Sequence, residues 1–191
     1  MKVGLFFGSF NPIHIGHLAI ANYITEFSDL NELWFVISPQ NPLKKKNTLL
    51  DEFERFNMVE LALKNDEKIK PTDIEFRLPK PSFTIDTLTY LNEKFPQNKF
   101  AIILGADNIE SFHKWKNYEE ILKNYELYIY PRPNYDLGDY KNHPNITEIN
   151  APIMEISSSF IRKSIKEGKD VRYFLPNEVY NYINKMFFYR N

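Results

Sequence analysis

Short apolar runs alternate with amphipathic segments along this chain, and this alternation restricts the folds open to it more than any other feature. Four runs rich in β-branched or aromatic residues are typical of strands buried on both faces: 2–7, 32–37, 99–104 and 126–130. Weaker strand candidates lie near 69–76 and 146–156. Helical patterns fall between the strands at about 17–27, 51–64, 84–95, 117–124, 158–167 and 177–188. This order predicts an α/β fold with right-handed crossovers and a mostly parallel sheet.

The length and composition indicate one domain without covalent cross-links. At 191 residues the chain is long enough to bury a sizeable core, and no repeat or linker divides it. We therefore expect a single domain over 1–191, with the helices from about 158 packed on the same core. The absence of cysteine excludes disulfides, cysteine-bound zinc and thiol nucleophiles. It is compatible with the reducing cytoplasm, where we expect the protein to be located.

The charge balance gives no general attraction to nucleic acid or to a membrane surface. Lysine and arginine together number 24 and aspartate and glutamate 25, which gives a net charge of −1. No apolar run approaches the ~20 residues needed to cross a bilayer, and no signal-peptide core precedes the first strand. We expect neither a nucleic-acid nor a membrane partner, whereas an oligomer of this chain is possible.

The residues after the first apolar run have the composition of an anion-binding turn. They join that run to a helical pattern and read Gly8-Ser9-Phe10-Asn11-Pro12-Ile13-His14-Ile15-Gly16-His17. A turn from strand to helix presents free backbone N–H groups and the positive end of the helix dipole. The two histidines are three residues apart, so on a first helical turn they face the same side. There they can donate hydrogen bonds to phosphate oxygens, and we expect them to gain charge easily near neutral pH.

Three further polar segments follow predicted strands, at 38–44, 105–107 and 156–162. Ligands of open parallel sheets bind beyond the carboxyl ends of the strands, so we expect these segments to converge. The serines and the arginine of the last segment form either an ordinary helix N-cap or a cradle for phosphates. Lys44 belongs to a run of three lysines, which is usually a solvated surface. Glu54 and Arg55 fit the charged outer face of a helix and need no functional role.

Together these segments resemble the H-x-G-H nucleotidylyltransferase superfamily and, within it, the bacterial nicotinate-nucleotide adenylyltransferases. The resemblance covers nearly the whole chain and includes, besides the turn at 8–17, the segments Asn41-Pro42-Leu43-Lys44, Pro81-Ser82-Phe83-Thr84-Ile85-Asp86-Thr87-Leu88, Gly105-Ala106-Asp107-Asn108, Phe112-His113-Lys114-Trp115-Lys116-Asn117-Tyr118 and Ile156-Ser157-Ser158-Ser159-Phe160-Ile161-Arg162. Several transferases share the H-x-G-H element, and the tryptophan segment combined with the Ser82–Thr87 segment narrows the subfamily. The departures are mild: the family usually has Asp, Pro, His and Thr in place of Asn11, Ile13, Leu43 and Ser159.

The resemblance implies a Rossmann-like, doubly wound α/β fold with helices on both faces of the sheet. It implies adenylyl transfer from ATP to nicotinate mononucleotide, a step of NAD biosynthesis. The implied catalytic residues stabilise charge on the reacting phosphates, and they are His14, His17, Lys44 and Arg162. The implied ATP-binding residues are Gly8, Ser9, Phe10, His17, Gly105, Asp107, Ser157, Ser158, Ser159 and Arg162. The implied contacts of the mononucleotide are Lys44, Thr84, Trp115 and the backbone at Tyr118. Mg²⁺ would bridge the ATP phosphates, with no protein side chain expected as its ligand.

Several alternatives remain open from the sequence alone. Trp115 could be a core residue instead of a platform on which a pyridine ring stacks. Asp107 could cap a helix instead of binding a ribose hydroxyl. The same chemistry could act on nicotinamide mononucleotide or on phosphopantetheine. A catalytically silent nucleotide-binding module is the remaining alternative, and the combination of His14, His17, Lys44 and Arg162 disfavours it.

Overall fold

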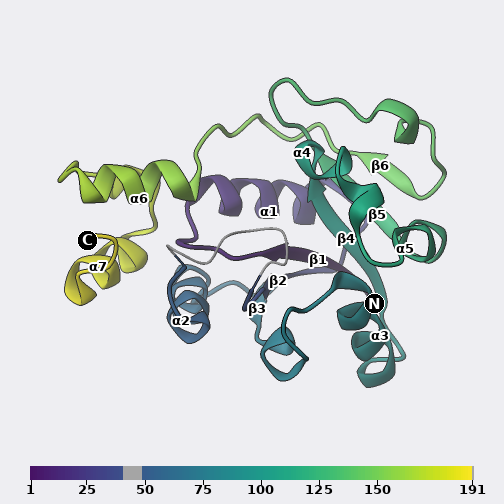
Figure 1. Ribbon diagram of the computed structural model, residues 1–191, viewed down its shortest axis with the longest axis horizontal. Helices are drawn as coiled ribbons and strands as arrows, with labels where there is room; N and C mark the ends of the chain where they lie inside the picture. The colour runs from purple at the N-terminus through teal and green to yellow at the C-terminus, as the bar shows by residue number, and fades with distance from the viewer. Residues whose placement is uncertain (41–48, 191) are drawn as a thin grey trace.

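The computed structural model describes residues 1–40 and 49–190 and contains a six-stranded parallel sheet (Figure 1). Its strands are β1 (Lys2–Gly8), β2 (Glu32–Ile37), β3 (Ile69–Thr72), β4 (Lys99–Gly105), β5 (Glu126–Tyr130) and β6 (Ile146–Glu148). They lie in the order β3-β2-β1-β4-β5-β6. The prediction of a doubly wound, mostly parallel sheet is confirmed.

Helices cover both faces of the sheet. The described α-helices are α1 (Ile15–Phe27), α2 (Glu52–Ala62), α3 (Thr84–Lys94), α4 (Ala106–Ile109), α5 (Tyr118–Asn124), α6 (Ser158–Lys166) and α7 (Asn177–Met186). Buried side chains of α1, α2, α6 and α7 share one hydrophobic cluster, and those of α3, α4 and α5 share another. Four short 3₁₀ helices lie in the connections: η1 (Ile74–Arg77), η2 (Phe112–Lys114), η3 (Gly138–Tyr140) and η4 (Arg172–Phe174).

Alternation along the central strands explains why the molecule has two cores. On β1, Leu5 contributes to the α3 side and Phe6 to the α1 side, and both are buried. On β2, Phe35 and Val36 divide in the same way. Successive side chains of a strand point to opposite faces, so an apolar run without polar interruptions supplies both layers at once.

The order of the strands creates a crevice between β1 and β4. The chain reaches β3 on one side of β1 and then crosses through α3 to β4, which pairs with β1 on its other side. Consequently α1, which follows β1, packs on one face, while α4, which follows β4, packs on the other. Loops that diverge in this way leave a binding crevice at the carboxyl ends of the strands.

Two weaker strand predictions are partly wrong. The strand expected near 69–76 ends at Thr72 and is followed by η1, and the one expected near 146–156 ends at Glu148. β6 is one of the two edge strands and pairs only with β5, and because β5 ends at Tyr130 the later residues have no strand to pair with. They run instead as an extended connection to α6.

The C-terminal helices lie at the end of the sheet where α1 and α2 also lie (Figure 1). Ile161 of α6 and Val179 and Ile183 of α7 belong to the same hydrophobic cluster as Ile20 of α1. The hydroxyl of Tyr182 donates a 2.6 Å hydrogen bond to Glu54 of α2, which ties α7 to the earlier part of the chain. Within the described ranges, no helix combines the length and apolar character needed to cross a membrane.

Candidate active site

Two histidine rings lie face to face at the start of α1. The ring centroids of His14 and His17 are 3.7 Å apart, and the ring planes differ by 22°. The helix begins here because His14, in an extended conformation, accepts a 3.0 Å hydrogen bond at its carbonyl from the His17 N–H. A Cβ added at Gly16 would lie 3.1 Å from the His14 ring and 3.6 Å from Cβ of Ile156. Glycine at this position therefore gives the imidazole room beside the backbone.

The ring of His14 is buried and uncharged at neutral pH. Burial, assisted by the positive charge of Arg132, lowers the pKa of His14 from 6.5 to about 4. The expectation that both histidines gain charge easily near neutral pH is therefore wrong for His14. Its Nδ1 atom is buried and has no hydrogen-bond partner among the described residues. Buried polar atoms are normally satisfied, so this atom is an exception to the usual pattern.

The start of α6 is bonded directly to the histidine turn. Ser157 caps the helix, because its hydroxyl accepts a 3.2 Å hydrogen bond from the backbone N–H three residues on. The hydroxyl of Ser158 donates to the carbonyl of Pro12 at 2.9 Å, although 146 residues separate the two. The guanidinium of Arg162 donates to the carbonyl of Asn11 at 2.7 Å. These bonds place a helix N-terminus and an arginine beside the turn that carries the histidines.

Two further contacts complete this joint, which we call the phosphate rim (8–17 and 157–162). Arg162 also donates to the hydroxyl of Ser159 at 3.3 Å, which brings the last of the predicted serines into the same set. The side-chain oxygen of Asn11 accepts a 2.8 Å hydrogen bond from the hydroxyl of Tyr189. The amide that stands where the family usually has an aspartate thus anchors the C-terminal segment.

Arg132 connects the rim to the residues after β4. Its Nε lies 3.5 Å from an Asp107 carboxylate oxygen, and its guanidinium donates to the carbonyl of Met154 at 3.1 Å and the hydroxyl of Tyr130 at 3.3 Å. Asp107 lies inside the first turn of α4, and Gly105 holds the N-cap position, so Asp107 is not the helix cap. A Cβ on Gly105 would come within 2.3 Å of the Asp107 carboxylate. No motif in the sequence pointed to a role for Arg132.

A pocket opens between the ends of β1 and β4, at the crevice that the strand order creates. Predicted substrate contacts Thr84 and Trp115 both line it, together with Gly8 and Gly105. The indole of Trp115 is half-buried and lies 5.4 Å from the ring of Phe112, measured between centroids. The tryptophan ring therefore packs against the core residue Phe112 and also borders the cavity. The remaining lining residues include Ser38, Gln40, Glu75, Ser82, Phe83, Asn108, Lys114, Lys116 and Tyr130.

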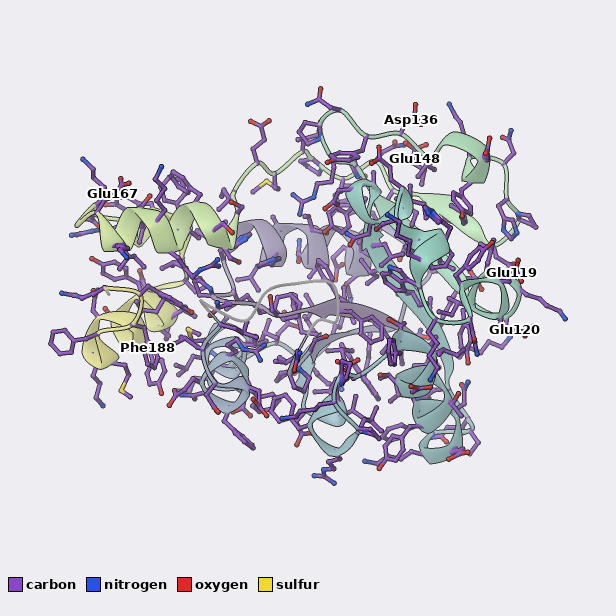
Figure 2. The ribbon with its side chains drawn as sticks, in the orientation of Figure 1. Glu119, Glu120, Asp136, Glu148, Glu167 and Phe188 are labelled. Carbon is purple, nitrogen blue, oxygen red and sulfur yellow. The ribbon has the colours of Figure 1, made fainter. Side chains whose placement is uncertain are left out.

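Tyr118 does not share this pocket. Its side chain lines a second hollow, and its backbone N–H donates to the carbonyl of Trp115 at 3.2 Å. Glu119 and Asp136 line the same hollow, and Figure 2 shows both on the side of the molecule that holds α5 and β6. The predicted contact with the mononucleotide runs through the backbone at Tyr118, so the position of this side chain leaves it a prediction.

Arg55 is fully buried, so its interpretation as a surface residue of α2 is wrong. Its guanidinium donates four hydrogen bonds to carbonyls, at 2.7 Å to Ser9, 2.8 Å to Ser38, 3.1 Å to Pro39 and 2.9 Å to Leu50. It thereby joins the turn after β1 to the turn after β2. Burial lowers the pKa of Arg55 from its usual value, although nearby acidic groups oppose this effect. The sequence did contain a sign of this burial, because Arg55, Met58 and Val59 recur at helical spacing on the buried face of α2.

The other predicted site residues take different positions. Gly8 and Ser9 offer backbone groups, because the Gly8 carbonyl accepts from Ser38 at 2.9 Å and the Ser9 carbonyl accepts from Arg55. Phe10 is a core residue, whose ring centroid lies 5.1 Å from that of His17. It thus supports a histidine ring. Lys44 lies outside the described residues.

Comparisons with known proteins agree with this geometry. A family model described as cytidylyltransferase-like matches residues 5–164. A protein of Flavobacterium johnsoniae named probable nicotinate-nucleotide adenylyltransferase is 54% identical over 192 residues, which cover 100% of both chains. A protein of Bacteroides thetaiotaomicron with the same name is 44% identical over 185 residues, covering 97% of this chain and 92% of the relative.

Solved structures give the same result. The structure of Plasmodium falciparum nicotinic acid mononucleotide adenylyltransferase complexed with NaAD is similar, with a TM-score of 0.84 and 25% identity. That similarity covers 98% of this chain and 97% of the other. A second structure of that enzyme, complexed with APC, has a TM-score of 0.83 at 25% identity and covers 98% and 96% of the two chains.

Proposed function

The chain belongs to the cytidylyltransferase-like family and, within it, to the nicotinate-nucleotide adenylyltransferases, and we propose that it joins nicotinate mononucleotide to ATP. An oxygen of the mononucleotide phosphate bonds to the α-phosphorus of ATP, and the bond from that phosphorus to the oxygen bridging it to the β-phosphate breaks. The products are nicotinate adenine dinucleotide and pyrophosphate. The attacking phosphate is already ionised, so the reaction needs neither a nucleophile nor a general base from the protein.

One observation supports this proposal above the others: the hydrogen bonds that hold α6 against the histidine turn. They gather two imidazoles, a guanidinium and a helix N-terminus around the turn that follows β1. Attack on a phosphorus spreads negative charge over its oxygens, and fixed donors lower the barrier by stabilising that charge. We assign the reacting phosphates to His14 and His17, and the leaving pyrophosphate to Arg162 and Ser157–Ser159. Lys44 keeps its predicted role at the reacting phosphates.

His14 acts in this scheme as a neutral hydrogen-bond donor. A triphosphate placed beside it would raise its pKa, because negative charge favours the protonated ring. Binding of ATP and proton uptake by His14 are thus coupled. Arg132 holds Asp107 at the edge of the rim, where its carboxylate can accept a hydrogen bond from a ribose hydroxyl.

We propose that a divalent cation, Mg²⁺, fits this site when it is bound to the phosphates of the nucleotide. The described residues contain no group of three or more acidic or histidine side chains able to hold a metal. Mg²⁺ is commonly held by substrate phosphates and water with few protein ligands, so the donor set agrees with an ion carried by ATP. When bound, such an ion neutralises charge on the phosphates.

The pocket beside the rim favours nicotinate over the alternative substrates. Trp115 offers a flat aromatic face, and Lys114 supplies positive charge at the pocket wall, whereas Lys116 is paired with Asp86. A pyridine carboxylate suits these groups better than an uncharged amide does. Phosphopantetheine has no planar ring at the corresponding position, and Trp115 would then have no partner. The cytoplasmic location stays a prediction.

Pyrophosphate release by the purified protein tests the proposal. With ATP and Mg²⁺ present, we expect turnover with nicotinate mononucleotide to exceed turnover with nicotinamide mononucleotide. The His17→Ala variant is expected to lose about 10²–10³-fold in kcat, because one fixed donor to the transition state is removed. Its unfolding midpoint is expected to stay close to that of the wild type. His113→Ala is the matched control, because His113 is an exposed residue of the second hollow.

Each outcome bears on a different part of the proposal. A normal rate in His17→Ala would contradict the role of the histidine turn. Faster turnover with the nicotinamide compound would contradict the choice of substrate. Failure of the wild type to release pyrophosphate with either mononucleotide would contradict the enzymatic function itself.

A further inference from the structure

A buried carboxyl group borders the substrate pocket and is not used by the mechanism above. Glu75 lies in η1, directly after β3, and its residue surface is only 2% exposed. It is nevertheless one of the residues that line the pocket with Trp115 and Thr84. One carboxyl oxygen accepts from the hydroxyl of Ser82 at 2.8 Å, and the other accepts from the hydroxyl of Thr87 at 2.8 Å.

The carboxyl group of Glu75 has hydroxyl partners but no cation. The hydroxyl of Ser38 is a third donor to it. Among the described residues, no lysine, arginine or histidine forms an ion pair with Glu75. Lys116, which lines the same pocket, is paired with Asp86. Burial raises the pKa of Glu75, and the three hydroxyls oppose that rise by favouring the ionised form. Hydroxyls carry no charge, so the negative charge is left without a balancing positive group.

The nicotinate mononucleotide of the proposed function carries a positive charge of the required kind. Its ring nitrogen is bonded to the ribose carbon, which makes the ring a pyridinium with a permanent positive charge. The pocket already offers an aromatic face for that ring at Trp115. A buried carboxylate and a buried ring cation stabilise each other strongly, because little water screens them.

We propose that the carboxylate of Glu75 is the counter-charge for the pyridinium ring of the mononucleotide and that it selects charged rings over uncharged ones. This inference rests on the proposed function. With Lys114 at the same pocket, the wall then carries both signs of charge, as the substrate does: a positive ring and a negative carboxylate.

The charge of the ring can be changed without changing its substituents. The 1,4-dihydropyridine form of nicotinate mononucleotide keeps the carboxylate, the ribose and the phosphate, but its ring is neutral. For the wild type we expect a KM at least 10-fold lower for the pyridinium form than for the dihydropyridine form, measured at pH 8. A wild type that shows no preference overturns the proposal, whatever any variant does.

The Glu75→Gln variant removes the charge and keeps groups that can bond the three hydroxyls. We expect its KM for the pyridinium form to rise about 10-fold, while its KM values for the dihydropyridine form and for ATP change less than about twofold. Glu75→Asp, which restores the charge, is expected to recover most of the preference. Glu93→Gln is the matched control, because Glu93 is an exposed carboxylate on α3.

Two results with Glu75→Gln would overturn the inference. An equal rise of KM for both ring forms would mean that Glu75 only positions Ser82 and Thr87. An unchanged KM for the pyridinium form would mean that its charge does not act on the ring. Calorimetric titration of nicotinate mononucleotide into the wild type and Glu75→Gln, without ATP, keeps the test independent of turnover. Weaker binding by the variant supports the inference even if the proposed adenylyl transfer fails, and equal binding overturns it.

Discussion

The phosphate rim and the adjoining pocket are built in opposite ways. The rim comes from two short stretches of sequence, 8–17 and 157–162, each of which contains the start of a helix, where we propose that phosphates bind. The pocket is assembled from single residues of separate segments, among them Ser38, Glu75, Thr84 and Trp115. Phosphate oxygens can be bound by backbone donors and helix ends, which local sequence specifies. A charged aromatic ring needs an aromatic side chain to stack on, a side chain of opposite charge and residues that enclose it. Only tertiary structure brings such groups together.

The largest expected effect removes the support that both regions share. Arg55→Met leaves the carbonyls of Ser9 and Ser38 without their buried donor, so the unfolding free energy should fall by about 3–5 kcal/mol. The KM values for ATP and for the mononucleotide should rise together, because Ser9 belongs to the rim and Ser38 lines the pocket. Denaturant unfolding and steady-state kinetics measure both effects. Arg77→Met, at an exposed arginine, is the control. A stable variant in which only one KM changes would show that the two regions do not depend on Arg55 jointly.

The next effect separates the two regions by pH. The imidazole of His14 takes up a proton near pH 6.5 in the unfolded chain but only near pH 4 in the folded one. Acid therefore favours the unfolded chain, and about 3 kcal/mol of stability should be lost as the pH falls from 6.5 to 4. Glu75 has the opposite sign, because burial raises its pKa above the ordinary 4.5 and its contribution decreases as the pH rises from there.

The unfolding free energies of the wild type and of His14→Asn, measured as a function of pH, check the prediction for His14. The difference in unfolding free energy between the two proteins should change by about 3 kcal/mol over pH 6.5 to 4, and the variant should have the flatter curve. Parallel curves would mean that His14 is protonated as readily in the folded protein as in the unfolded chain.

The smallest effect is confined to the pocket. Trp115→Ala removes a stacking face that contributes about 1 kcal/mol, so the KM for the mononucleotide should rise about fivefold while the KM for ATP stays unchanged. Trp115→Phe should retain most of the affinity, because a ring remains. Initial-rate kinetics with each substrate varied in turn separate the two constants. A change in the KM for ATP alone would place Trp115 with the rim and not with the pocket.

The strongest parts of the fold were predictable from the sequence for a physical reason. Buried parallel strands must be apolar on both faces, and the runs at 2–7, 32–37, 99–104 and 126–130 end within one residue of the observed strands. The prediction for the strand at 146–148 extended too far, because the length of an edge strand depends on its pairing partner and not on its own residues. In the rim, the segments at 8–17 and 157–162 were identified and the structure joins them by hydrogen bonds.

Charged residues in the interior account for most of what could not be predicted. An arginine on a helix and a glutamate after a weak strand are usually solvated. For Arg55 the helical spacing with Met58 and Val59 was the one local sign of burial, and the sequence held no such sign for Glu75. Their partners are carbonyls and hydroxyls from other segments, so only the assembled structure shows what satisfies them. For Tyr118 the resemblance implied a contact through the backbone, and the structure adds that its side chain lines another hollow.

The bond from Tyr189 to Asn11 has a consequence for how the protein is made. The turn at 8–17 is synthesised before its partners at Ser158, Arg162 and Tyr189, because a chain grows from its N-terminal side. A growing chain therefore holds the predicted phosphate-binding turn well before the residues that bond to it exist. We expect fragments that end before Ser158 to lack the joint between this turn and α6 and to bind nucleotides only weakly.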